Sequence, residues 1–181
     1  MAFADDPVWG PALRPADGST SHLLPYWRLF VDGAHRFGTV RMTPGGEAVS
    51  VWLPPGMLDE LSGAGAAAFE RLLDDEGDPA LRADLDQLYE RFAASRHGLA
   101  DHYYLSLLAT HHEHRGKGIG QALLAADLAL WDAEGAPAYL ESTNPANDHR
   151  YQRAGFRSIG GFQAVRGGGW VNAMWRDPTP T

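Results

Sequence analysis

Residues 105–124 constrain the fold of this chain more than any other stretch. They begin with the apolar run Leu105 to Thr110, which predicts a buried strand. A polar loop follows at 111–114, and then come the sequence Arg-Gly-Lys-Gly-Ile-Gly at 115–120 and an apolar pattern with helical spacing. This order predicts a buried strand, a glycine-rich turn and a helix in direct succession.

The glycines of this turn, Gly116, Gly118 and Gly120, alternate with larger residues. Positions without side chains allow backbone N–H groups to point inward, next to the positive end of the new helix. Such a turn can bind phosphate groups, and Arg115 and Lys117 would add positive charge at its edge. The segment therefore predicts a phosphate-binding turn, although a purely structural turn would also explain the glycines.

The glycine spacing distinguishes this turn from two familiar phosphate-binding motifs. A P-loop requires Ser or Thr after its lysine, and neither follows Lys117. The dinucleotide motif requires G-x-G-x-x-G, whereas the glycines here fall as G-x-G-x-G. The pattern Arg-x-x-Gly-x-Gly between a strand and a helix resembles the pyrophosphate-binding segment of the GNAT superfamily, the N-acyltransferases that use acetyl-CoA.

The segment downstream extends this resemblance. The family places an Asn, a Tyr four residues later and then a Gly-Phe pair, and this spacing is repeated by Asn147, Tyr151, Gly155 and Phe156. Within the superfamily, the chain resembles puromycin N-acetyltransferase-like antibiotic acetyltransferases, which also carry a Leu-Glu-[Ser/Thr] strand, here at 140–142, and a Gly-rich turn before the last strand, here at 167–169. The resemblance is strong over residues 100–176 and weak before residue 47.

The resemblance implies an α/β GNAT fold in a single domain, residues 1–181, with a mixed, mostly antiparallel sheet. Its central parallel strand pair would splay apart between flanking helices. Patterning predicts helices at 23–36, 57–97 (broken at 77–79), 119–134 and 145–154, and strands at 37–42, 48–53, 102–110, 138–143, 156–165 and 170–175. Residues 2–4 would end a helix, so the family's first strand is expected to be missing.

Composition restricts the possible functions. The chain has no cysteine, which excludes disulfides, thiolate metal sites and a cysteine nucleophile. Its formal charge of −8 opposes broad nucleic-acid binding and suits a cationic substrate, although solubility explains it equally well. The sequence shows neither a signal-peptide pattern nor an apolar run long enough to span a membrane, so we expect a cytoplasmic protein.

The resemblance also implies acetyl-CoA as cosubstrate. Its pantetheine arm would bind where the central strand splays from its neighbour, and a backbone N–H there would serve the acetyl oxygen. Asn147 would bind the same arm or cap the short helix that follows. The residues expected to bind acetyl-CoA are Leu108, Ala109, Thr110, Arg115, Gly116, Lys117, Gly118, Ile119, Gly120, Gln121, Asn147 and Tyr151.

Two residues are candidates for acid–base catalysis. Tyr151 would donate a proton to the departing thiolate, a transfer that is uphill by about 2 kcal/mol for an unperturbed phenol and thiol. Glu141, at the end of a strand, would remove the ammonium proton of the acceptor directly or through water. A core tyrosine and a salt-bridged glutamate are the alternatives. The histidines at 111, 112 and 114 lack the spacing of a known metal motif, so we expect no metal.

The leading hypothesis is transfer of an acetyl group from acetyl-CoA to a primary amine of a small molecule, such as an antibiotic, by direct attack. The alternatives are a non-catalytic acyl-CoA-binding module, an acetyltransferase acting on a protein amine and, more distantly, a phosphotransferase. We expect neither a nucleic-acid nor a membrane partner, and a monomer or homodimer.

Overall fold

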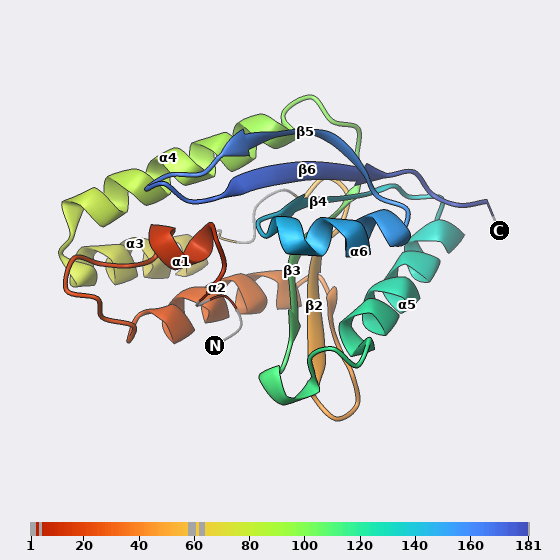
Figure 1. Ribbon diagram of the computed structural model, residues 1–181, viewed down its shortest axis with the longest axis horizontal. Helices are drawn as coiled ribbons and strands as arrows, with labels where there is room; N and C mark the ends of the chain where they lie inside the picture. Colours follow the sequence, from red (N-terminus) through yellow and green to blue (C-terminus); the bar gives the residue numbers. More distant parts are fainter. Residues whose placement is uncertain (1–2, 4, 58–60, 62–63, 181) are drawn as a thin grey trace.

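The structure is a computed structural model that describes residues 3, 5–57, 61 and 64–180. At its centre is a six-stranded sheet with the order β1-β2-β3-β4-β6-β5 (Figure 1). The strands are β1 (Val40–Met42), β2 (Ala48–Leu53), β3 (Tyr103–Thr110), β4 (Ala138–Ser142), β5 (Arg157–Gln163) and β6 (Trp170–Arg176). Neighbouring strands are antiparallel except for β3 and β4, which are parallel. This sheet confirms the predicted fold class.

Helices cover both faces of the sheet. They are α1 (Trp9–Ala12), α2 (Leu23–His35), α3 (Ala64–Glu76), α4 (Pro79–Arg96), α5 (Ile119–Ala133) and α6 (Asp148–Arg153), with 3₁₀ turns η1 (His112–His114) and η2 (Pro145–Asn147). The helices α1, α2, α3 and α4 share one apolar core with one face of the sheet. The helix α5 shares a second apolar core with the other face. Figure 1 shows α5 on the opposite side of β2 and β3 from α1, α2 and α3. No helix in the described part of the chain is both long and apolar enough to cross a membrane.

The parallel strands β3 and β4 separate earlier than the sequence analysis predicted. Their register contains only Tyr103 opposite Ala138 and Tyr104 opposite Tyr139. The next residues of β3 include a bulge, because Val51 pairs with Leu107 whereas Trp52 pairs with Leu105, which leaves Ser106 as the extra residue. A bulge bends its strand and increases its twist. We therefore attribute the opening, which was expected at 108–110, to the bulge at Ser106.

Most of the predicted elements are present, with shorter ends. The expected strand at 37–42 begins only at Val40, because Gly38 has a φ of +70° and belongs to the turn that ends α2. The helical region expected from residue 57 begins at Ala64 as described, and residues 58–60 and 62–63 lie outside the described part. Of the helix end expected at 2–4, only Phe3 is described. Among the described residues before Val40, none lies in a strand.

A buried carboxylate fixes α5 to the first hairpin of the sheet. Asp127 is fully buried on α5 and accepts hydrogen bonds from Ser50 Oγ (2.6 Å) and Trp52 Nε1 (2.8 Å) on β2. It also accepts a hydrogen bond from Arg41 Nε on β1. These contacts hold the helix that follows the glycine-rich turn in a fixed position over the sheet.

Replacing Asp127 with alanine is expected to destabilise the protein by about 3–5 kcal/mol, because Arg41, Ser50 and Trp52 would lose their buried acceptor. The melting temperature should fall by about 10 °C or more, as measured by calorimetry. Asp32→Ala is the matched control, since Asp32 pairs with Arg28 on the surface, where both side chains are largely exposed. If both variants melted like the wild type, the buried network would not stabilise the fold.

Candidate active site

A cavity of about 600 Å³ opens where β3 meets the start of α5. Its walls come from the end of β3, the glycine-rich turn, η2, α6 and the segment before α1. Most of the predicted acetyl-CoA-binding residues line it, namely Leu108, Ala109, Thr110, Arg115, Gly116, Gly118, Ile119, Gly120, Gln121, Asn147 and Tyr151. The structure therefore brings together the two sequence segments, around residues 115 and 147, that carried the resemblance.

The glycines of the turn are needed for its shape. Gly118 has a φ of +76° and is the N-cap of α5, a conformation that other residues rarely adopt. Gly120 lies so close to β3 that a Cβ atom would be 2.6 Å from Thr110 Oγ1. The first N–H groups of a helix have no partner within the helix, so those that follow Gly118 are available to an anion. This local geometry fits a pyrophosphate group.

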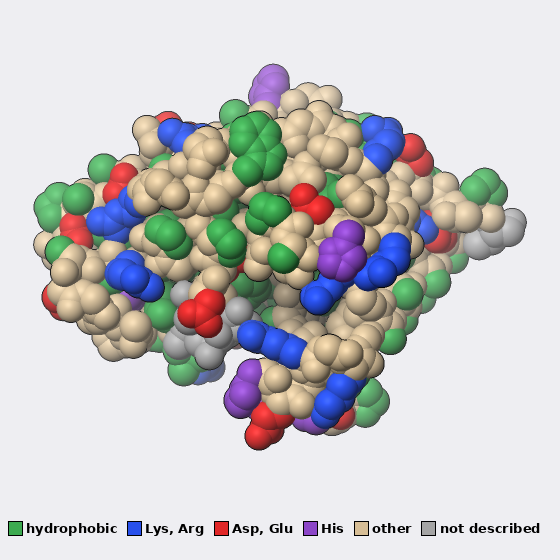
Figure 2. Space-filling view, viewed as in Figure 1, with side chains coloured by type: hydrophobic (Ala, Val, Ile, Leu, Met, Phe, Trp, Pro, Cys, Tyr) green, Lys and Arg blue, Asp and Glu red, His purple; other side chains and the backbone are tan. Residues whose placement is uncertain are grey.

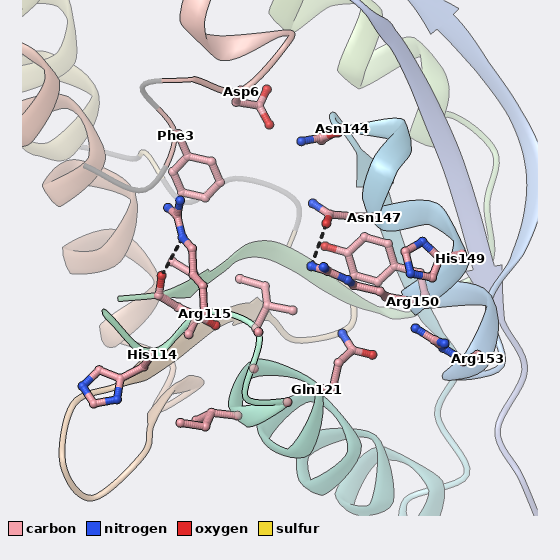
Figure 3. A pocket seen from close by; sticks show the side chains of 18 of the residues that line it. Phe3, Asp6, His114, Arg115, Gln121, Asn144, Asn147, His149, Arg150 and Arg153 are labelled. Atoms are coloured by element: carbon pink, nitrogen blue, oxygen red, sulfur yellow. Dashed lines mark hydrogen bonds between the residues drawn. The ribbon is translucent and has the colours of Figure 1, made fainter. Parts of the chain in front are cut away.

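The opposite wall of the cavity is formed by α6 and η2, and it is basic. Asn144 caps η2 by accepting a hydrogen bond from the Ala146 N–H at 3.0 Å. Asn147 occupies the N-cap position of α6 but makes no capping bond with its side chain, so that alternative for Asn147 is wrong. Asn147 accepts a hydrogen bond from Arg150 Nη1 at 3.0 Å (Figure 3). His149, Arg150 and Arg153 line the cavity from α6. Basic side chains thus face the glycine-rich turn across the cavity.

Tyr151 lies on this wall with its side chain half-buried. Its ring packs edge-to-face on Phe156, with ring centroids 6.2 Å apart. Burial raises the pKa of Tyr151 to about 12, and the negative charges of Asp6 and Asp148 contribute further. The hydroxyl therefore keeps its proton at neutral pH and can act as a hydrogen-bond donor in the cavity.

Two of the predicted site residues, Lys117 and Glu141, are not among the described residues that line this cavity. Glu141 lies on β4 with its side chain only 1% exposed. Its Oε1 accepts a hydrogen bond from Tyr139 Oη at 2.8 Å and lies 3.9 Å from Arg96 Nε. Burial and the charge of Glu141 raise the pKa of Tyr139. Glu141 is therefore held against Tyr139 and Arg96, outside the described lining of the cavity.

Sequence reasoning missed several residues that line the cavity: Phe3, Asp5, Asp6, Asn144, His149, Arg150 and Arg153. The spacing of Arg150 and Arg153, three residues apart on a helix that also carries Tyr151, is a signal that could have found the basic wall. The sequence around Asp6 contained no comparable signal, because Asp6 is held at the cavity by a hydrogen bond from Thr143, which is 137 residues away in the sequence.

Among the described residues, one group of potential metal ligands lies close together. The ligand atoms of His111, Glu113 and His114 are within 4.8 Å of one another, and His111 and Glu113 are exposed. A protein site for zinc usually has a further fixed ligand or a buried setting. The absence of a metal stays a prediction.

The face of the molecule that carries the cavity is hollowed, and charges of opposite sign lie on different sides of the hollow. Figure 2 shows lysine and arginine side chains at the right of the hollow and an acidic side chain at its left. The residues that line the cavity agree with this view, since the arginines come from the turn and α6 and the aspartates from the segment before α1.

An open mixed sheet whose parallel pair splays beside a glycine-rich helix start is the architecture of the GNAT acetyltransferases. Residues 78–158 match the family model described as acetyltransferase (GNAT) domain. This match and the likeness to a solved acetyltransferase structure of 25% identity support an acetyltransferase (GNAT) domain in this part of the chain.

Two solved structures illustrate the likeness. The crystal structure of histone acetyltransferase HPA2 and related acetyltransferase from Corynebacterium glutamicum superposes with a TM-score of 0.69 at 25% identity, over 99% of this chain and 87% of that one. Arylalkylamine N-acetyltransferase 2 from Aedes aegypti superposes with a TM-score of 0.59 at 15% identity, over 98% of this chain and 89% of that one. The second likeness concerns the fold alone.

Proposed function

We propose that the protein transfers an acetyl group from acetyl-CoA to a primary amine of a small molecule, by direct attack of the amine. The observation that carries the proposal is the single cavity that contains both the glycine-rich turn and Tyr151. The proposed pyrophosphate site and the proposed proton donor would then lie on facing walls. Acetyl-CoA supplies an activated thioester, and the protein supplies binding and orientation.

The residues that would hold acetyl-CoA follow from the walls of the cavity. The N–H groups around Gly118 and the side chain of Arg115 would bind the pyrophosphate, with Arg150 and Arg153 adding positive charge from α6. The edge of β3 from Leu108 to Thr110, which has left β4, would pair with the pantetheine arm. Asn147, which lines the same cavity, would bind the same arm.

Tyr151 is our candidate for the acid. With a pKa of about 12, complete proton transfer to a thiolate would be uphill by about 3.5 pKa units, or about 5 kcal/mol, rather than the ~2 kcal/mol of an unperturbed phenol. We therefore infer that Tyr151 acts mainly as a hydrogen-bond donor that stabilises the departing sulfur. Removal of its hydroxyl should then affect turnover more than binding.

Glu141 remains our candidate for the base, but it would have to act through water. Its carboxylate is buried against Tyr139 and Arg96 and lies outside the described lining of the cavity. A chain of water molecules through the opening between β3 and β4 would have to carry the proton. Direct contact between Glu141 and the acceptor would require rearrangement of this cluster.

The acceptor class is the least constrained part of the proposal. We favour a small-molecule amine, including an antibiotic of the puromycin type, because the formal charge of −8 suits a cationic substrate. The alternative, a protein amine, gains support from the Corynebacterium glutamicum structure, whose description includes a histone acetyltransferase. A cytoplasmic location and a monomeric or homodimeric state belong to the same proposal.

The test is a competition assay with labelled acetyl-CoA. Puromycin, aminoglycosides, polyamines and a lysine-rich peptide are supplied under identical conditions, and the products are separated by mass spectrometry. We expect a small-molecule amine to be acetylated with the highest kcat/KM. If only the peptide reaches about 10⁴ M⁻¹s⁻¹, the protein amine is the substrate instead. If acetyl-CoA binds but none of the amines reacts, the non-catalytic module is favoured.

A further inference from the structure

The cavity has two electrostatic ends. Arg150 and Arg153 make its α6 side basic, which suits phosphate groups, and Arg115 faces them across the cavity from the turn (Figure 3). Its acidic end is formed by Asp5 and Asp6, from the segment before α1. The phosphates of acetyl-CoA would be repelled by the aspartates, so this second end requires a different ligand group.

Asp6 is held in one orientation by three hydrogen bonds. Its Oδ1 accepts from the N–H groups of Val8 (2.9 Å) and Trp9 (3.0 Å), and its Oδ2 accepts from Thr143 Oγ1 at 2.8 Å. A carboxylate offers about four acceptor positions, so these bonds leave capacity for another donor. In Figure 3 the Asp6 carboxylate points from its segment toward Asn144 and the interior of the site.

Asp6 is linked to the end of β4 by a hydrogen bond and to Tyr151 by its charge. Thr143 directly follows the end of β4, on the strand that separates from β3. The negative charge of Asp6 also contributes to the raised pKa of the hydroxyl of Tyr151, after burial, which means that the two side chains influence each other across the cavity. An ammonium bound by Asp6 would therefore face the proposed acid across the cavity.

Aromatic rings lie next to this carboxylate. Phe3 lines the cavity, and its ring lies 4.6 Å from that of Trp27, which in turn packs edge-on against Trp9 at 5.2 Å. Asp5 and Asp6 also line a second, shallower hollow of about 620 Å³ on their other side, so they form a wall between the two.

Resting on the proposed function, we propose that Asp6 binds the ammonium group of the acceptor and selects cationic primary amines that carry an apolar or aromatic body. The carboxylate supplies a fixed negative charge, Phe3 supplies an apolar surface and the formal charge of the chain, −8, attracts cations. The ammonium group of the acceptor would be held there in its protonated form, and it would have to lose a proton before the amine attacks the acetyl group.

The test measures binding, so that it does not depend on turnover. Phenethylamine and its neutral counterpart, phenethyl alcohol, are titrated calorimetrically into the full chain saturated with coenzyme A. We expect the wild type to bind the amine about 10- to 100-fold more tightly than the alcohol, as for a hydrogen bond to a charged group. Asp6→Asn should abolish this preference, since the amide keeps an acceptor for Val8 and Trp9 but loses the charge.

Asp17→Asn is the matched control, because Asp17 is an exposed aspartate that also accepts a backbone N–H hydrogen bond, from Ser19, and lies outside the described lining of both hollows. It should retain most of the preference for the amine. Equal loss in both variants, or no preference in the wild type, would overturn the assignment of Asp6. If Asp6→Asn does not fold, Thr143→Val, which removes one of the bonds that orient Asp6, should weaken amine binding about 3- to 10-fold. Charge-selective binding without any acetylation would refute the proposed activity while leaving this site in place.

Discussion

Gly118→Asp should abolish binding of acetyl-CoA, with a loss of affinity of about 100-fold or more, equivalent to about 3 kcal/mol. Gly118 is the N-cap of α5 with a φ of +76°, and the N–H groups behind it are those expected to bind the pyrophosphate. An aspartate there would place a negative charge in the phosphate site and strain the backbone. Calorimetric titration of acetyl-CoA into the folded variant measures the effect.

Gly135→Asp provides the control for this experiment. Gly135 follows the other end of α5 with a φ of +67°, and, like Gly118, it has open space around the position of a Cβ atom. The backbone strain and added charge are therefore matched, but the phosphate site is distant. We expect normal affinity for acetyl-CoA. Equal losses in the two variants would mean that general destabilisation explains the result, and normal affinity in Gly118→Asp would refute the phosphate-binding turn.

Tyr151→Phe should lower kcat by about 10- to 1000-fold while changing the affinity for acetyl-CoA little. The hydroxyl is the only group removed, and the ring can keep its edge-to-face contact with Phe156. Steady-state kinetics with a good acceptor, together with calorimetric titration of acetyl-CoA, separates the two effects. A variant with unchanged kcat would show that another acid or a water molecule assists the leaving group.

Tyr103→Phe is the matched control for this substitution. Tyr103 stacks on Trp131 of α5 and donates a hydrogen bond from its hydroxyl to Glu134 Oε2 at 2.7 Å, away from the cavity.

Because the pKa of Tyr151 is raised to about 12, the Tyr151 hydroxyl stays protonated below that pH. We therefore expect no loss of kcat from its ionisation below about pH 10, where an unperturbed phenol would already be half ionised.

The turn and the core strands could be predicted from the sequence because their signals are local. The alternate glycines at 116–120 indicate a turn whose backbone is accessible at those positions, and the apolar run of β3 indicates a buried strand. The predicted bounds of β2, 48–53, match the structure. The helix expected from residue 145 also begins there, as η2, because Asn144 caps it within a few residues.

Features that depend on distant contacts could not be predicted. The early separation of β3 from β4 depends on a bulge at Ser106, which becomes visible only when β2 is paired with β3. Asp6 reaches the site through Thr143 at the other end of the chain, and its local sequence resembles an ordinary turn. Glu141 was expected beside the acceptor because it lies near a strand end, but strand position does not reveal that Tyr139 and Arg96 surround it.

The central claim is direct transfer of an acetyl group from acetyl-CoA to an amine in the cavity between the glycine-rich turn and α6. It is tested most directly by incubating the protein with acetyl-CoA labelled in the acetyl group, first alone and then with the best acceptor from the competition assay, and following label and released thiol together. The account predicts no label on the protein in either case and, with the amine present, one labelled acetyl group on the amine for each thiol released. Label that accumulates on the protein without the amine, or thiol released without an acetylated amine, would contradict it.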